Sequence, residues 1–568
     1  MKRKSIKAIA ALLCLATVFS LSACGSDNSA DLVIRNGMVY TADGKGTVAE
    51  AIAVNGDEIV YVGDEQGVEK FIKSSTKDID MNGGMVLPGF TDSHQHPSAM
   101  ANELFMVSLL DCKSDEEYIE TIKEYYQNNP DVESIVGAGW DRPLFDSVKQ
   151  TKETLDEISA EIPIVMSDSG YHMKWMNSKA LEMMGINKDS EVPEGAMVEK
   201  NENGEPTGVV SDYPGISDKF NQFTKDQYKE AILAYQEEAL ACGLTGSFED
   251  TPSNFDRVVE AYNELESEGK LKYRVNAYMR ISKDDDIEKS VAELKSYSEN
   301  NNNGLFRVDG AKIFIDGVLE GETAYMEEAY ANNPENYGQY RWKGATDRLN
   351  ELCRLLEKEG LNYHFHAIGD KAVAIALDAI EYAKADAKDS VTRPGITHLQ
   401  FVNEKDIKRF KELGVSAVIQ AFWAGYDEYY EQSVELLGKS RADRQYPIES
   451  LFKEGILVAS GSDFPVQTDR PLIAIEMGVT RAFPGETKSL PEDKEKAKLE
   501  DMILSYTLNG AIANGRENET GSIEIGKKAD LVVLDKNLFK IPAAKIAETK
   551  ETVTIFNGEV VYEKNAKN

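Results

Sequence analysis

The alternation of apolar and polar positions divides the chain into two β-rich ends and a longer middle region. Near the start, residues 32–40 and 51–62 each contain an Asn-Gly pair between apolar runs, which is typical of a hairpin turn. Near the end, residues 526–534 and 553–562 again show short apolar runs typical of strands, with a turn between apolar runs. The two ends are therefore expected to fold together as one small β-sandwich domain. That domain would comprise residues 31–86 and 515–568.

The middle region alternates buried apolar runs with amphipathic helices. Helices are expected over residues 347–359 and 370–385, and other helices are expected to end near Gly414 and at Gly455. Apolar runs that follow these two glycines have the composition of buried strands. Repeated strand and helix units predict a parallel sheet, either open or closed.

The length of this region bears on its organisation. Residues 87–514 far exceed the roughly 250 residues of a plain (β/α)₈ barrel. An insertion is therefore expected, and the helical, polar stretch at about residues 98–215 is where we place it.

The N-terminus has the layout of a bacterial secretory signal, with Lys2, Arg3 and Lys4 ahead of an apolar run over residues 9–21. That run is too short to remain as a membrane-spanning helix. The tetrapeptide Leu21 to Cys24 resembles the lipobox of bacterial lipoproteins, whose cysteine becomes the lipidated first residue. We expect a lipid-anchored, extracytoplasmic protein; the alternative is an ordinary signal with an incidental cysteine. The expected segments are a signal peptide at 1–23 and a tether at 24–30.

Charge and cysteine content exclude two classes of function. The formal net charge of −35 makes nucleic acid an unfavourable partner, because phosphates would be repelled. Cys112, Cys242 and Cys353 are widely spaced, which argues against a disulfide scaffold and against a thiolate metal site. Cys353 shares a helical face with leucines and is expected in the core. The oligomeric state stays open, a homo-oligomer included.

The six histidines all lie in the middle region. His94 and His96 follow an apolar run, and residues two apart on a strand point the same way, so both imidazoles can reach one ion. His364 and His366 repeat this spacing, and we expect one of them to bind metal and the other to line the pocket. His398 follows a further strand. Exposed loop histidines or ordinary core histidines are the alternative.

A carboxylate completes the candidate site. Asp463 ends the buried run that begins at Ile456. In a parallel barrel the C-terminal strand ends open on one face, so these distant residues would converge. Histidine nitrogens with a carboxylate oxygen suit zinc or a similar divalent ion.

Lys312 lies inside an apolar strand, where an unpaired ammonium would be costly. A buried lysine tends to lose its proton. The neutral amine can add carbon dioxide to form a carbamate that bridges two metals. The alternative is an ion pair with Asp316 or Asp463.

These motifs, taken in order, resemble the ligand set of the amidohydrolase superfamily, and in particular its amidohydrolase-3 branch, the N-substituted formamide deformylase-like proteins. The resemblance covers nearly the whole chain after the signal. It implies a (β/α)₈ TIM-type barrel beside a β-sandwich, with one or two divalent ions, zinc being expected. The stretches that carry the resemblance are residues 86–96, 175–181, 312–317, 366–370, 461–466 and 521–530.

The resemblance also implies roles for single residues. His94 and His96 would hold one metal together with Asp463, His366 and His398 would hold the other, and carboxylated Lys312 would bridge them. His172 matches a position that faces substrate. The family usually has a proline and a nearby histidine after the glutamine that corresponds to Gln420, whereas this chain reads Gln-Ala-Phe-Trp-Ala over 420–424. Substrate contacts at that rim are therefore expected to differ.

The sequence thus predicts hydrolysis of a C–N bond in an amide, N-substituted formamide or cyclic amide by metal-activated hydroxide, with Asp463 as general acid and base. The pocket would be shaped by His172, Trp140, Trp175 and His364. Alternatives on the same ligands are a mononuclear deaminase and a lactone or ester hydrolase. A different class is an extracytoplasmic lipoprotein that binds a solute or metal, although a pure binder would not need Asp463 as a base.

Overall fold

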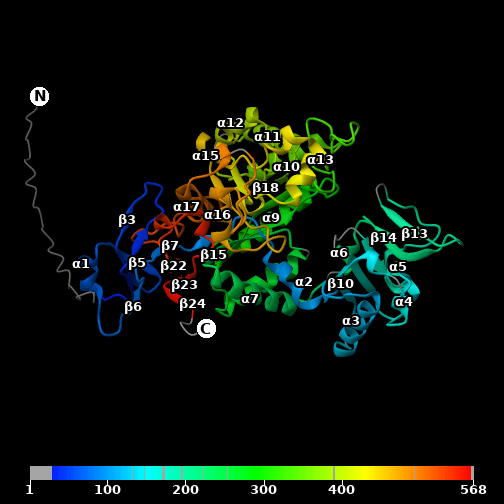
Figure 1. Cartoon of the computed structure of the whole chain (residues 1–568), viewed down its shortest axis with the longest axis horizontal. Coiled ribbons are helices and arrows are strands. Elements are labelled where there is room, and N and C mark those ends of the chain that lie inside the picture. The colour runs from blue at the N-terminus through cyan, green and yellow to red at the C-terminus, as the bar shows by residue number, and fades with distance from the viewer. Residues whose placement is uncertain are drawn as a thin grey trace, which may run out of the picture.

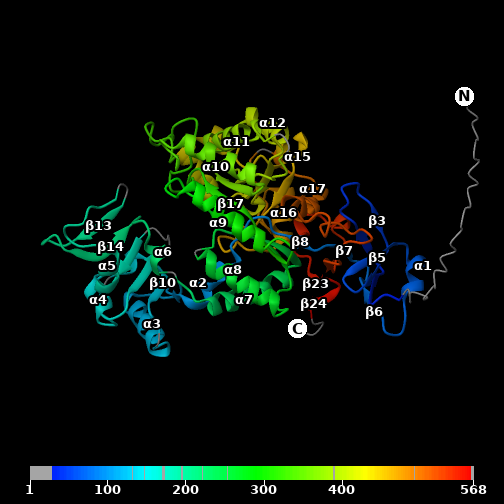
Figure 2. The same cartoon turned by 180° about the vertical axis from the view of Figure 1, so that it is seen from behind.

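The computed structural model describes residues 29–564 except 131, 146, 169–172, 194–195, 221, 253, 388–389 and 492. The expected signal peptide, with Cys24, and the candidate His172 lie outside these residues. Figure 1 shows a central barrel with a smaller β-rich unit on each side of it, and Figure 2 shows the same arrangement from behind.

The centre of the molecule is an eight-stranded sheet in which every neighbouring pair is parallel. Its two edge strands approach each other, and the Ser93 N–H donates to the Ser460 carbonyl at 2.9 Å. The sheet is therefore a nearly closed α/β barrel of the TIM type. Its strands are β8 (Phe90–Thr91), β15 (Leu244–Asp250), β16 (Arg274–Arg280), β17 (Phe306–Phe314), β18 (Asn362–Ala367), β19 (Gly395–His398), β20 (Ser416–Ile419) and β21 (Val458–Ser460).

Helices cover the outside of this barrel (Figure 1). They include α7 (Lys225–Ala241), α8 (Phe255–Ser267), α9 (Ile287–Asn300), α10 (Thr346–Glu359), α11 (Asp370–Ala385), α12 (Glu404–Leu413), α15 (Ile448–Glu454), α16 (Pro471–Thr480) and α17 (Leu499–Tyr506). The predicted helices 347–359 and 370–385 are confirmed to within one residue as α10 and α11. Cys353 is buried against the barrel, as expected.

The predicted helix ends at Gly414 and Gly455 are also confirmed. Both glycines have positive φ angles, 64° and 74°, and their N–H groups cap the last turns of α12 and α15. Glycine is favoured in this left-handed conformation because it has no Cβ atom. The chain can then reverse directly into the next barrel strand.

Two further sheets lie at the ends of the described chain, one made of N-terminal strands alone and the other of strands from both ends. Their orders are β5-β4-β1-β6 and β24-β23-β22-β7-β2-β3. Side chains from both sheets meet in one apolar core that includes Leu32, Ile52, Val86, Leu531 and Ile555. Their strands are β1 (Leu32–Arg35), β2 (Met38–Tyr40), β3 (Val48–Ala49), β4 (Ala51–Asn55), β5 (Glu58–Gly63), β6 (Lys77–Asp80), β7 (Met85–Pro88), β22 (Leu531–Leu534), β23 (Glu551–Phe556) and β24 (Glu559–Glu563).

A third unit lies between β8 and β15 in the sequence and on the opposite side of the barrel from the two end sheets (Figures 1 and 2). This stretch was expected to be helical, but it contains a six-stranded sheet of order β13-β14-β12-β11-β10-β9. The apolar runs of β10 and β11 are fully buried, which explains why they form central strands. Its elements are β9 (Val107–Ser108), α3 (Asp115–Asn128), β10 (Ile135–Trp140), α4 (Lys152–Asp156), β11 (Ile164–Asp168), β12 (Met173–Met176), α5 (Ser178–Met184), β13 (Met197–Lys200) and β14 (Pro206–Ser211).

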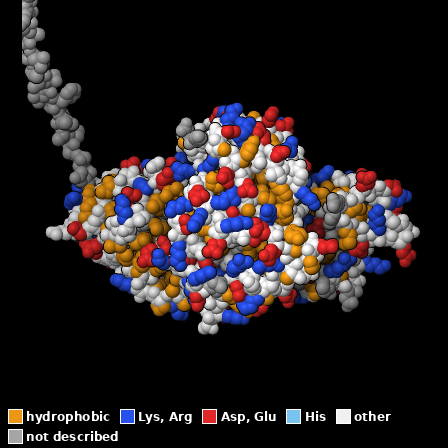
Figure 3. Space-filling model, turned by 90° about the horizontal axis from the view of Figure 1, so that it is seen from above, with side chains coloured by type: hydrophobic (Ala, Val, Ile, Leu, Met, Phe, Trp, Pro, Cys, Tyr) orange, Lys and Arg blue, Asp and Glu red, His pale blue; other side chains and the backbone are white. Residues whose placement is uncertain are grey.

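Acidic and basic side chains are interspersed over the face seen in Figure 3, so the excess of carboxylates is spread over that face. Within the described part of the chain, no helix is both long enough and apolar enough to cross a membrane.

Candidate metal centre

Histidines and carboxylates from separate strands meet at the C-terminal end of the barrel. His94 and His96 follow β8, and Asp463 follows β21. The Nε2 atoms of His94 and His96 lie 3.2 and 3.1 Å from the same Asp463 Oδ1 atom. Ligand atoms of these three residues all lie within 4.8 Å of one another. One ion could therefore be reached by all three.

His398 and His366 lie beside this group. The His398 ring is 4.9 Å from the His94 ring and 4.4 Å from the His366 ring, measured between centroids. The structure thus brings together the five residues that the sequence analysis selected as histidine and aspartate ligands. These residues are far apart in the sequence, but the barrel brings them together because β8, β18, β19 and β21 end at the same face.

Hydrogen bonds orient three of these rings. His96 Nδ1 donates to the Asp250 carbonyl at 2.6 Å, His366 Nε2 to the Gly317 carbonyl at 3.0 Å, and His398 Nδ1 to Gln420 Oε1 at 3.0 Å. A carbonyl oxygen only accepts, so the hydrogen sits on the bonded nitrogen of each ring. The other nitrogen is then the one available to a metal.

Burial keeps most of these imidazoles in the neutral form that binds metals. It lowers the pKa of His94 and His398 well below the ordinary value and that of His366 to about 3. His96 differs: burial acts to lower its pKa, but the hydrogen bond and negative charge of Asp463 outweigh burial and raise it to about 9. Metal binding at His96 must therefore displace a proton.

Lys312 is buried on β17, and its ammonium pairs with Asp250. The partner is therefore neither Asp316 nor Asp463, the two carboxylates that were the alternative to a carbamate at this position. Asp316 is occupied elsewhere, since its carboxylate accepts from the backbone N–H groups of Tyr325, Ile368 and Gly369 at 2.8, 3.1 and 2.9 Å. Burial lowers the pKa of Lys312, while Asp250 opposes that shift.

Asp250 is the residue that sequence reasoning missed. It is the last residue of β15, it is fully buried, and its Oδ2 lies 3.2 Å from His94 Nδ1. The available signal was the one used for Asp463, a carboxylate at the end of a buried strand.

The donor set fits a cation. Asp250 Oδ1 is buried and has no hydrogen-bond partner among the described residues, and His94 Nδ1 makes no hydrogen bond of good geometry. An unsatisfied buried polar atom costs about 1 to 3 kcal/mol. A divalent ion bound among these lone pairs would remove that cost.

The segments that carry the ligands have strained backbone conformations and are held together by hydrogen bonds. His398 and Asp463 have positive φ angles of 76° and 62°, which are unusual for residues with a Cβ atom. Asp92 links the two edge loops, because its carboxylate accepts from the His94 N–H at 3.0 Å and from the Ser462 N–H at 3.0 Å. Burial raises the pKa of Asp92 to about 7. Asp92 is therefore a positioning residue of this site.

The expected substrate residues are placed differently from the ligands. His364 lies on β18 below the ligand cluster, 4% exposed, with its ring stacked on His94 at 5.2 Å and packed near Phe248. Trp140 and Trp175 are fully buried in the core of the inserted sheet. Their indole N–H groups donate to the Met166 and Thr151 carbonyls. The expectation that these two rings shape a substrate pocket has no support from this placement.

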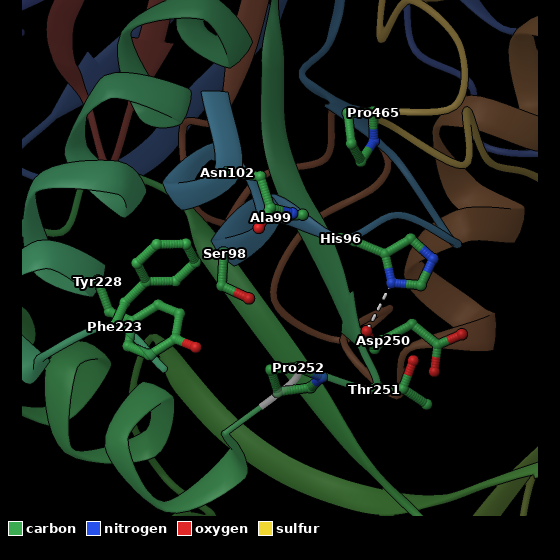
Figure 4. Close-up of a pocket in the computed structure, with 10 residues that line it drawn as sticks. All are labelled: His96, Ser98, Ala99, Asn102, Phe223, Tyr228, Asp250, Thr251, Pro252 and Pro465. Carbon is green, nitrogen blue, oxygen red and sulfur yellow. Dashed lines mark hydrogen bonds between the residues drawn. The ribbon is translucent and has the colours of Figure 1, made fainter. Parts of the chain in front are cut away.

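A pocket of about 200 Å³ adjoins the ligand cluster (Figure 4). His96 and Asp250 lie on one side of it, and Phe223 and Tyr228 lie on the other. Neither aromatic residue was singled out from the sequence. The loop before α7 and the first turn of α7 carry them, and no motif marks that segment.

Comparison with known proteins adds the wider context. A model of the amidohydrolase family matches residues 77–562. The chain is 29% identical to the putative amidohydrolase YtcJ of Bacillus subtilis, over 93% of this chain and 99% of that protein. It is 25% identical to the N-substituted formamide deformylase of Arthrobacter pascens, over 94% and 98%.

A solved structure shares this architecture. An uncharacterized metal-dependent hydrolase from Pyrococcus furiosus superimposes with a TM-score of 0.73 at 26% identity, over 90% of this chain and 100% of that one.

Proposed function

The chain belongs to the amidohydrolase family, and from that premise we propose that it hydrolyses a C–N bond in an amide, N-substituted formamide or cyclic amide. The family and its relatives support a metal-dependent hydrolase. The choice of a C–N bond draws on the similarity to the N-substituted formamide deformylase.

One observation carries the proposal. The imidazoles of His94 and His96 converge on a single oxygen of Asp463 at 3.2 and 3.1 Å, deep in the mouth of the barrel. A binding protein needs ligands, whereas a hydrolase also needs a base beside them. Asp463 offers a second carboxylate oxygen for that task.

A divalent ion would be held by His94, His96 and Asp463, with His366 and His398 as further ligands. When bound, such an ion lowers the pKa of water and polarises a carbonyl group. Zinc suits the nitrogen and oxygen donors.

Asp463 supplies the proton transfers. Burial acts to raise its pKa, but the hydrogen bond from His96 and the nearby His398, His96 and Lys312 outweigh burial and lower it. The carboxylate is therefore ionised at neutral pH and can take a proton from the attacking water. It then returns that proton to the leaving nitrogen, which departs as a neutral amine.

Lys312 bears on the number of metals. Its pairing with Asp250 supports an ammonium at this position. The predicted carbamate remains a proposal, and a mass measurement on the peptide that contains Lys312 tests it. A single-metal deaminase is the second candidate function, favoured by this ion pair, and ammonia release with one metal per chain would distinguish it.

The test is a substrate panel on the purified full chain loaded with zinc, manganese or cobalt. The panel comprises a simple amide, an N-substituted formamide, a lactam and an ester, each assayed with the parent chain and with Asp463→Asn. Hydrolysis of at least one C–N substrate by the parent alone supports the proposal. Ester cleavage alone, or equal rates for both chains, overturns it.

We also propose, on the sequence alone, that the protein is anchored outside the cytoplasm through lipid on Cys24. Metabolic labelling with a radioactive fatty acid should mark the parent chain and leave Cys24→Ala unlabelled. Labelling of both chains would contradict the proposal.

A further inference from the structure

The pocket beside His96 has one polar end and one aromatic end. Figure 4 shows His96 and Asp250 on one side, facing the rings of Phe223 and Tyr228 across the cavity. Pro252 contributes a further apolar wall. The cavity volume is about 200 Å³. A cavity of about 150 Å³ can already hold benzene, so this one has room for a substituted ring.

The aromatic end is rigidly built. The rings of Phe223 and Tyr228 pack edge to face with centroids 5.7 Å apart, and Phe223 also packs against Phe105 at 6.0 Å. Thr224 caps the start of α7 in a reciprocal capping box with Gln227, which fixes the backbone between the two rings. The wall is therefore formed before any ligand binds.

The buried hydroxyl of Tyr228 is unsatisfied among the described residues. The side chain is 2% exposed, and its hydroxyl has no hydrogen-bond partner among the described residues. Leaving such a group unsatisfied costs about 1 to 3 kcal/mol. Burial raises its pKa to about 12, so the group stays neutral and can both donate and accept.

The two carboxylates near the pocket, those of Glu249 and Asp250, already have hydrogen-bond or ion-pair partners. Ser98 lines the cavity, but its N–H and hydroxyl both donate to Glu249 at 2.9 Å, and Tyr262 donates to the same carboxylate at 2.8 Å. Asp250 pairs with Lys312. The remaining Asp250 oxygen, Oδ1, is one of the lone pairs that the metal ion would take up, so a cationic group of a substrate would compete with the metal there.

An anion is also disfavoured. The described residues that line the cavity include neither lysine nor arginine. A carboxylate placed there would lose hydration, and the one positively charged group on the wall, the His96 ring, is already paired with Asp463 at 3.1 Å. The pocket therefore suits a neutral group.

We propose that this cavity is the specificity subsite for a neutral, ring-sized group of the substrate, and that Tyr228 donates or accepts one hydrogen bond with a polar atom on that ring. The proposal rests on the proposed hydrolase function, because a specificity subsite presupposes a substrate. The binding of the ring itself can be measured without turnover.

The binding experiment uses two small probes on the full chain. Calorimetric titration with 4-hydroxybenzyl alcohol and with benzyl alcohol compares the parent, Tyr228→Phe, Ala99→Leu and the control Tyr382→Phe, whose ring is 50% exposed on α11. Tyr228→Phe should weaken 4-hydroxybenzyl alcohol about fivefold and leave benzyl alcohol unchanged, as expected for one hydrogen bond. Ala99→Leu should weaken both probes, because the added side chain fills the cavity.

Stability and metal content separate this role from a structural one. Tyr228→Phe should keep the metal content of the parent and should not lower its melting temperature, because the hydroxyl that it removes has no hydrogen-bond partner among the described residues. Equal binding of 4-hydroxybenzyl alcohol to the parent and Tyr228→Phe overturns the hydrogen bond. Unchanged binding of both probes to Ala99→Leu overturns the subsite.

The kinetic experiment compares N-benzylacetamide, N-methylacetamide and N-acetylglycine. The parent should prefer the benzyl compound over the methyl compound by about tenfold or more in kcat/KM, and should disfavour the carboxylate. Ala99→Leu should remove the preference while the methyl compound is still cleaved. If no amide is cleaved but the probes bind as expected, the proposed function fails and the pocket stands. If amides are cleaved without a ring preference, the subsite fails and the function stands.

Discussion

The two ends of the barrel bury polar groups to a similar degree but satisfy them differently. At the N-terminal end, Arg274 of β16 donates to Asp530 at 2.8 Å and to Asn557 at 2.6 Å. Arg516 donates to Asn276 at 2.6 Å and to the Leu305 carbonyl at 2.7 Å. At the C-terminal end, buried atoms of Asp250, His94 and His364 have no such partners in the part of the chain that the structure describes.

This difference separates a structural cluster from a functional one. Paired guanidiniums join the barrel to the end sheets, because Asp530 and Asn557 belong to the C-terminal segment. Lone pairs without partners are instead costly to the folded chain and available to a ligand. Asn514 Oδ1 at the N-terminal end also has no partner among the described residues, although the Asn514 carbonyl accepts from Asn276 at 2.9 Å.

The largest effect expected is from metal removal. Dialysis against a chelator should reduce hydrolysis to the background rate, because the activated water is lost, and added zinc should restore it. The melting temperature should fall on removal, since the ligand stabilises only the folded state. Full activity in chelator-treated, metal-free protein would contradict the assignment of a metal site to the C-terminal end of the barrel.

Asp463→Asn should reduce kcat by about 10² to 10⁴-fold. The amide keeps the shape of the side chain but cannot take the proton. Steady-state kinetics on the substrate found in the panel measures the loss, and metal analysis shows whether the ion is retained. A variant that retains both metal and parent kcat would show that the base lies elsewhere.

Arg274→Ala should act on stability instead. Asp530 would be left buried and unpaired, and the free energy of unfolding should fall by about 3 to 5 kcal/mol. Denaturant unfolding measures the change, and kcat per folded molecule should stay at the parent value. The exposed pair of Lys77 and Glu563 provides the control, because Lys77→Ala should change stability by less than about 1 kcal/mol. A large fall in kcat for folded Arg274→Ala would show that Arg274 also contributes to activity, and the distinction between the two ends of the barrel would not hold.

Gln420→Ala should have the smallest of these effects. It removes the hydrogen bond that orients His398, and metal affinity should weaken about 10 to 100-fold. Competition with a fluorescent chelator measures this affinity, with Gln432→Ala on α13 (Glu428–Leu437) as the matched control. Parent affinity in Gln420→Ala would remove His398 from the set of ligands.

The ligands could be predicted because their signals are local. His94, His96, His366, His398 and Asp463 each follow an apolar run, and parallel strands deliver such positions to one face. The bounds of α10 and α11 followed from apolar spacing for the same reason. Gln420 was noted as a departure at the rim, yet its bond to His398 could not be read from the sequence.

The remaining features depend on contacts between distant segments. Asp250 pairs with Lys312 across 62 positions, and the spacing of neither residue indicates the other. The inserted sheet was missed because β9 and β13 are short and its polar helices dominate the pattern. Trp140 and Trp175 were selected as rings near a motif, but only tertiary packing decides whether a tryptophan faces a ligand or a core.

The seam of the barrel sets the order in which the protein can mature. Asp92 and Ser462 are 370 positions apart, and their hydrogen bond brings the ligand loops of the two edge strands together. Contacts of such long range form late in folding, after many shorter loops have closed. A nascent chain that lacks the residues beyond β21 has all six histidines but lacks Asp463, the carboxylate proposed as the base. If Asp463 has the proposed role, such a chain stays without its base until synthesis has passed residue 463, so the site can be completed only after the last strand of the barrel has been made.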